Sequence, residues 1–235
     1  MLGCAGNEAD IERAKYLVGR GGIANANSAL NILTPMLADT SITGSEKFEL
    51  IKLYAGAKMS AAGFDSIKLI SALVFTDDDK ILKAMRSAGV NITNDSFTLL
   101  TDAETTLNAF IATAGFDGGT VREQSQTYFQ ISLVKFLQGM RIFLKVSGFA
   151  AEDEATFDVT ACQSTFGASN LITNPDAPVY GLGQMTDSRA MMINAEQAKL
   201  SAENDLPVNL QSMIDELTPI IDDAQEVCNY LETNI

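Results

Sequence analysis

Apolar residues recur at steps of three and four along most of the chain, which is the pattern of amphipathic α-helices. Alternation with a period of two is nowhere sustained. One stripe contains Leu50, Leu53, Tyr54, Ala57 and Ala61, and another contains Ala103, Leu107, Phe110, Ile111 and Ala114. The pattern therefore predicts an all-α fold of antiparallel helix pairs, as a degenerate repeat array or a helical bundle.

The most apolar and the longest stripes make further predictions. Residues 128–146 are interrupted by amide and charged side chains, so we expect a buried core helix there rather than a membrane span. The longest stripe runs over residues 210–231 and contains Pro219. A proline inside a helix predicts either a kink or a new helix start, here with Thr218 as its N-cap.

Glycines mark the expected helix ends. The sequence Ala62-Gly63-Phe64-Asp65 is echoed by Ala114-Gly115-Phe116-Asp117. A glycine after a helical stripe is typical of a left-handed C-cap, so we expect such caps at Gly63 and Gly115. The pairs at 21–22 and 118–119 lack the lysine of a phosphate-binding loop and are interpreted as turns between helices.

Residues 53–63 resemble the first helix and turn of a tetratricopeptide repeat. Ala55 and Gly56 occupy the small-residue positions where paired helices approach, and Gly63 occupies the turn. Residues 29–35 resemble the end of the preceding second helix, closed by the proline of that family. The resemblance covers about residues 10–75 and lacks the family's tryptophan. It implies a concave face that binds a protein or a ligand, and it implies no catalysis.

The N-terminus, Met1-Leu2-Gly3-Cys4-Ala5-Gly6, resembles the lipobox of bacterial lipoproteins. That resemblance implies lipidation of Cys4, with residues 1–9 as a flexible tether. It implies a periplasmic protein that a lipid anchors to a bacterial membrane, and the membrane we expect is the outer membrane. The alternative is an incidental cysteine near a disordered start.

The remainder, residues 10–235, is expected to form a single helical domain. Helix-pair repeats span 10–147, a loop-rich segment spans 148–187, and C-terminal helices span 188–235. The loop-rich segment is either a lid or binding loop or a connecting crossover. Cys162 and Cys228 either pair in an oxidising compartment or are small buried hydrophobic residues.

The composition limits the partners and the reactions that this chain is expected to have. The 235 residues carry a net charge of −14 and no histidine. The negative charge argues against nucleic acid as a partner, and the absence of histidine removes the commonest general base and metal ligand. The clustered carboxylates at 77–79, 152–154, 215–216 and 222–223 are interpreted as solvated faces or helix starts, without an EF-hand pattern. We predict no catalytic residue, no metal and no cofactor.

Methionine and phenylalanine residues suggest one candidate site, although core filling is the favoured interpretation, because such residues at helical spacing are normal in a core. An apolar ligand pocket between helices would be lined by Phe129, Phe136, Met140, Phe143, Met191 and Met213.

The resemblances and this candidate pocket lead to two hypotheses for the function of the protein. The first is a non-enzymatic envelope lipoprotein that acts as an interaction scaffold or as an accessory component of a membrane-associated complex, such as a transport system. The alternative is a carrier that binds a lipid-like or other hydrophobic small molecule; an enzyme is the weakest hypothesis.

Overall fold

The fold is known from a computed structural model that describes residues 4–64, 95–146, 160, 162–163, 178–197 and 206–234. Within these ranges the chain forms helices and no strand, which confirms the all-α prediction. The helices are α1 (Cys4–Arg20), α2 (Ile23–Leu37), α3 (Gly44–Ala61), α6 (Ser96–Ile111), α7 (Ala114–Asp117), α8 (Val121–Val146), α10 (Pro178–Gln197), α11 (Leu206–Leu217) and α12 (Ala224–Asn234).

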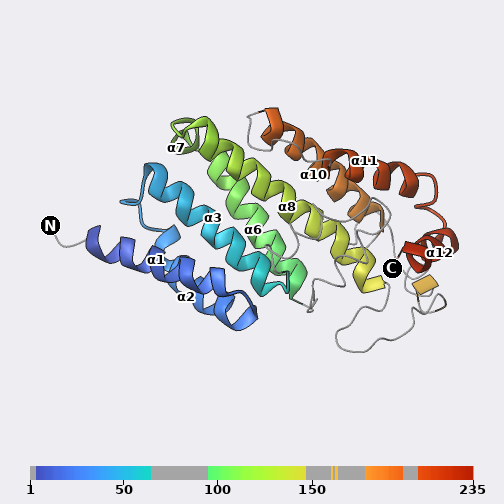
Figure 1. Ribbon diagram of the computed structural model, residues 1–235, viewed down its shortest axis with the longest axis horizontal. Coiled ribbons are helices and arrows are strands. Elements are labelled where there is room, and N and C mark those ends of the chain that lie inside the picture. Colours follow the sequence, from blue (N-terminus) through green and yellow to red (C-terminus); the bar gives the residue numbers. More distant parts are fainter. Residues whose placement is uncertain are drawn as a thin grey trace.

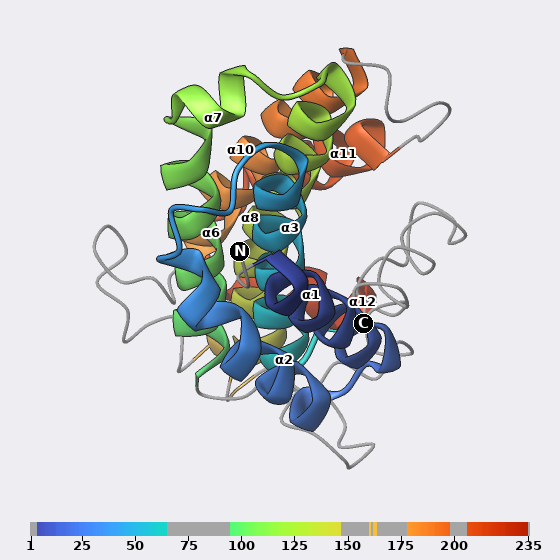
Figure 2. The same ribbon diagram turned by 90° about the vertical axis from the view of Figure 1, so that its left-hand side faces the viewer.

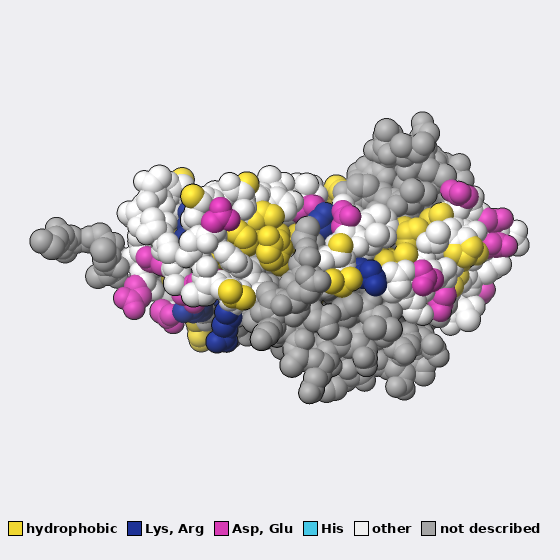
Figure 3. Space-filling model, turned by 90° about the horizontal axis from the view of Figure 1, so that it is seen from above, with side chains coloured by type: hydrophobic (Ala, Val, Ile, Leu, Met, Phe, Trp, Pro, Cys, Tyr) yellow, Lys and Arg dark blue, Asp and Glu magenta, His cyan; other side chains and the backbone are white. Residues whose placement is uncertain are grey.

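The helices pack side by side in an elongated body (Figure 1). Helices α1, α2 and α3 contact one another, and α3 also contacts α6 and α8. Helix α10 packs against both α8 and α11. The start of α1 and helix α12 lie toward opposite ends of the long axis, and Figure 2 looks onto the end at which α1 begins. Acidic side chains appear toward both ends of the face shown in Figure 3. The elongated shape therefore gives the molecule two distinct ends.

Helix α3 belongs to both hydrophobic cores. Its residues Leu50 and Tyr54 pack with α1 and α2, whereas Phe48 and Met59 pack with α6 and α8. A helix that is covered on two sides must be apolar on two sides. This explains why residues 54–57 of α3 are all buried. Ala55 and Gly56 are small, and the space beside Gly56 is closed by Val18 of α1.

Two of the predicted glycine caps have different outcomes. The prediction at Gly63 is confirmed, because its φ is 94° and the N–H of Phe64 donates to the carbonyl of Met59 at 3.0 Å. The prediction at Gly115 is wrong, since this glycine lies inside α7. The hydroxyl of Thr113 accepts from the N–H of Phe116 at 3.3 Å. This cap starts a new helical turn where a left-handed turn was expected.

Three predicted boundaries also change. Residues 4–9 are the first turns of α1 instead of a flexible tether, and Asn7 Nδ2 donates to Asp39 Oδ2 at 3.4 Å. Helix α10 begins at Pro178, ten residues before the expected start, because proline suits the first helical turn. At Pro219, where a kink or a new helix start capped by Thr218 was expected, the helix instead ends: α11 stops at Leu217, and α12 begins at Ala224 with Asp223 as its N-cap. The Asp223 carboxylate accepts from two backbone N–H groups of the first turn.

The turn between α7 and α8 gives a stability prediction. A Cβ on Gly119 would overlap the ring of Phe48 at Cζ and would lie 3.1 Å from the carbonyl oxygen of Phe116. The Phe48 ring is itself fixed, with its centroid 4.8 Å from that of Phe110. Gly119→Ala should therefore lower the free energy of unfolding by roughly 1–3 kcal/mol through overpacking. Urea denaturation tests this, with Gly118→Ala as the control, since its nearest new contact would be 3.6 Å away.

Helix α8 starts with a reciprocal cap. The Glu123 carboxylate accepts from the backbone N–H of Thr120 at 2.8 Å and from its hydroxyl at 2.7 Å, and the N–H of Glu123 donates back to that hydroxyl at 3.3 Å. Hydrogen bonds from the Ser45 side chain and from Thr120 lower the pKa of Glu123 to about 2. The cap therefore also ties the start of α8 to the start of α3.

This cap predicts a pH dependence. Because the pKa of Glu123 is lower in the folded protein, its ionised form favours folding above its ordinary pKa. The contribution is lost as the pH falls toward about 2. Wild type should be more stable than Glu123→Gln at neutral pH, and the difference should shrink below about pH 4 as the carboxylate is protonated. Urea midpoints across pH measure it, and a difference that does not change with pH would contradict the assignment.

Candidate functional site

Three helices bring charged and amide side chains together beside α8. Lys135 of α8 donates to Glu104 of α6 at 2.9 Å and to Asp187 of α10 at 3.0 Å. Gln138, one turn further along α8, donates from Nε2 to the second oxygen of Glu104 at 2.9 Å. We call these four residues the polar seam. It links α6, α8 and α10 through side chains that are distant in the sequence.

Three side chains of the polar seam are largely shielded from solvent, and the fourth is exposed. The Lys135 and Glu104 side chains are 10% and 18% exposed, Gln138 is fully buried, and the Asp187 side chain is 61% exposed. Burial alone would lower the pKa of Lys135, but its hydrogen bonds to Glu104 and Asp187 outweigh that effect and raise the pKa. Lys135 is therefore protonated at neutral pH and cannot serve as a general base there.

Further polar contacts continue along α8. The hydroxyl of Ser188 donates to the carbonyl of Ser132 at 2.7 Å, and both residues are fully buried. At the other end, the Arg141 guanidinium lies 5.3 Å from the ring centroid of Phe97, a cation–π contact. These interactions pin α10 and α6 to α8. The Oε1 atom of Gln138 is buried without a hydrogen-bond partner, which makes the seam a costly part of the core.

Sequence reasoning missed this arrangement, although a signal existed. Lys135, Gln138 and Arg141 recur every three residues inside the most apolar stretch of the chain, a spacing that indicates a polar face as well as an interruption of a membrane span. Residues at this spacing share one face of a helix. The partners Glu104 and Asp187 carried no comparable signal, because their places depend on how the helices pack.

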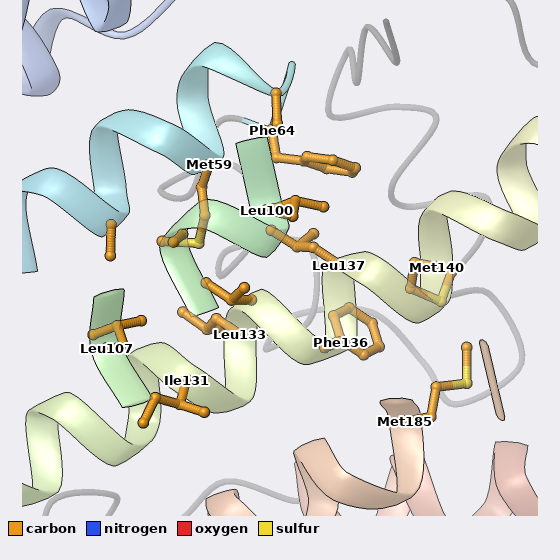
Figure 4. Close-up of a cluster of buried hydrophobic side chains, with 14 of the residues drawn as sticks. Met59, Phe64, Leu100, Leu107, Ile131, Leu133, Phe136, Leu137, Met140 and Met185 are labelled. Atoms are coloured by element: carbon orange, nitrogen blue, oxygen red, sulfur yellow. The ribbon is translucent and has the colours of Figure 1, made fainter. Parts of the chain in front are cut away.

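The six residues of the candidate apolar pocket are only partly placed. Phe136 and Met140 are fully buried and Met213 is nearly so, all within the main core that also contains Met185 (Figure 4). Phe129 packs against that core from its edge. The side chains of Phe143 and Met191 lie outside the described residues. The described members thus pack as ordinary core side chains.

The cysteines and carboxylates are placed as follows. Cys162 and Cys228 form a disulfide, and both residues are fully buried. Cys4 is the first residue of α1. The carboxylates at 215–216 and 222–223 are exposed, as expected for solvated faces, whereas those at 77–79 and 152–154 lie outside the described residues.

Among the described residues, no group of three or more potential ligands could hold a metal ion. In the same part of the chain, none of the helices has the length and apolarity needed to cross a membrane. No protein-family model, curated protein or solved structure matches the chain. The tetratricopeptide-type and lipoprotein resemblances therefore stay predictions.

Proposed function

We propose that this protein is a non-enzymatic envelope lipoprotein. It is anchored through Cys4 to the bacterial outer membrane and faces the periplasm. There it acts as an interaction scaffold or as an accessory component of a membrane-associated complex. The observation that carries the proposed location is the buried disulfide between Cys162 and Cys228, because disulfides persist in oxidising compartments.

The chemistry of the polar seam supports a role without catalysis. Lys135 is held by two carboxylates, and its pKa is raised instead of lowered. A lysine that acts as a base or a nucleophile needs the opposite shift. The polar seam therefore has the properties of a structural crosslink between helices.

An experiment on Cys4 tests the proposal. Wild type and Cys4→Ser should be expressed with their native leader in cells that process lipoproteins, fractionated, and treated with an amine-reactive crosslinker. Wild type should be found in the membrane fraction and crosslink to an envelope protein. Cys4→Ser should be released from the membrane and lose most of that crosslink. Equal membrane association of the two forms, or no crosslinked partner for wild type, would sink the proposal.

A further inference from the structure

We propose that α10 and α11 form a cover that opens from α8 while α3, α6 and α8 stay folded together. In the open form, two apolar side chains of α8, Phe136 and Met140, become accessible to solvent. This motion follows from how the helices are held together, and it does not depend on the lipidation of Cys4.

The first argument is the polar character of the surface by which α10 is held. Among the residues of α10 whose side chains the structure describes, the buried ones are Gln184, Met185 and Ser188, and two of these three are polar. In α6, four of the five buried residues are apolar, namely Leu100, Ala103, Leu107 and Phe110. Burial of apolar surface drives packing, whereas a hydrogen bond between helices largely replaces one to water. Less free energy therefore holds α10 in place than holds α6.

The second argument is the pairing of polar groups across the contact between α8 and α10. Lys135 lies opposite Asp187, and Ser132 lies opposite Ser188, so the two helices run antiparallel. The Asp187 side chain is 61% exposed, so solvent already reaches the ion pair. Each of these groups can bond to water instead when α10 moves away. A contact of this kind suits an opening that leaves the rest of the core intact.

The same antiparallel register continues the polar contact along α8. Gln138 lies one turn after Lys135, and Gln184 lies about one turn before Asp187, so the register places the two glutamines opposite each other. Both glutamines are buried. Gln138 Oε1 has no hydrogen-bond partner in the closed form, which is costly for a buried acceptor. Water can donate to this oxygen once α10 moves away, so opening relieves a cost of the closed form.

The third argument is what the cover hides. Phe136 and Met140 lie on the side of α8 toward Met185 of α10, whereas Leu137 lies on the side toward Leu100 of α6 (Figure 4). Helix α11 packs against α10, so we expect the two helices to move together. Opening therefore uncovers an apolar strip that contains two residues of the candidate pocket, and it leaves the contact between α6 and α8 in place.

The reactivity of introduced thiols tests this opening. In a Cys4→Ser background with the native disulfide intact, an introduced cysteine is the only free thiol. Ser188→Cys places it between α8 and α10, and Ser60→Cys places it at a matched buried position in α3. Position 188 should react with N-ethylmaleimide roughly ten-fold faster than position 60 and with a weaker dependence on urea, because partial opening exposes less surface than global unfolding. Labelling at position 188 that is no faster than at position 60 would overturn the proposal.

A second substitution shows whether the two positions become exposed in the same step. Leu107→Ala removes a fully buried side chain of α6 whose surroundings do not change when the cover opens. It should speed labelling at position 60 several-fold and leave the rate at position 188 unchanged. An equal acceleration at both positions would mean that α10 leaves only on global unfolding, and the proposal would fail.

Hydrogen exchange of the unsubstituted chain gives a reading that no introduced cysteine can disturb. Backbone amides of α10 and α11 should exchange faster than those of α6 and α8, since they are exposed by the smaller opening. Equal protection of the four helices would contradict the cover.

Discussion

Lys135→Met should lower the free energy of unfolding by about 3–5 kcal/mol. The substitution keeps an unbranched side chain of similar length but removes the charge that Glu104 and Asp187 share. The Glu104 side chain is only 18% exposed, so its carboxylate would stay buried with Gln138 as its remaining partner among these residues. Urea denaturation followed by circular dichroism measures the change as a lower midpoint at an unchanged slope.

Two further variants separate this effect from a general loss of charge. In Lys135→Met with Glu104→Gln, the buried carboxylate is neutral as well, so much of the lost stability should return. Lys15→Met removes a lysine whose partners, Glu12 and Glu49, are 63% and 38% exposed, and it should cost no more than about 1 kcal/mol. Equal losses for Lys15→Met and Lys135→Met would show that the polar seam is not a buried crosslink.

Removing the disulfide should cost about 4 kcal/mol. The bond joins residues separated by 66 positions, and closing a loop of that length restricts the unfolded chain by roughly this amount in the chain-entropy model. Cys162→Ala with Cys228→Ala removes the bond without leaving free thiols in the core. The urea midpoint of this double variant should fall well below that of the oxidised wild type.

Reduction provides the matched control for that variant. Wild type in dithiothreitol should show nearly the same midpoint as the double variant, and the double variant should not respond to reductant. If the midpoint of wild type is the same with and without reductant, the pairing of Cys162 and Cys228 does not contribute to stability in solution.

Local features were predictable from the sequence, because each depends on a few neighbouring residues. The helix over residues 128–146, which is buried over residues 131–141, the left-handed cap at Gly63 and the helix break near Pro219 are of this kind. The cap formed by Thr120 and Glu123 belongs with them, since Ser or Thr followed by Glu three residues later marks a helix start.

Long-range features were not predictable in the same way. Lys135 and Asp187 are 52 positions apart, and Gln138 and Glu104 are 34 apart. Only the packing of α6 and α10 on α8 brings these residues together. The spacing of residues along one sequence does not reveal which distant helices pack against each other. The disulfide is not predictable from the sequence for the same reason, because pairing depends on the separation of two backbones.

The most direct test of the account is the chemical state of the N-terminus of the protein taken from its native membrane. Peptide mass spectrometry should find a mature chain that begins at Cys4 and carries acyl chains on that residue. An unmodified Cys4 inside a longer N-terminal peptide, in protein recovered from the soluble fraction, would contradict the proposed lipoprotein.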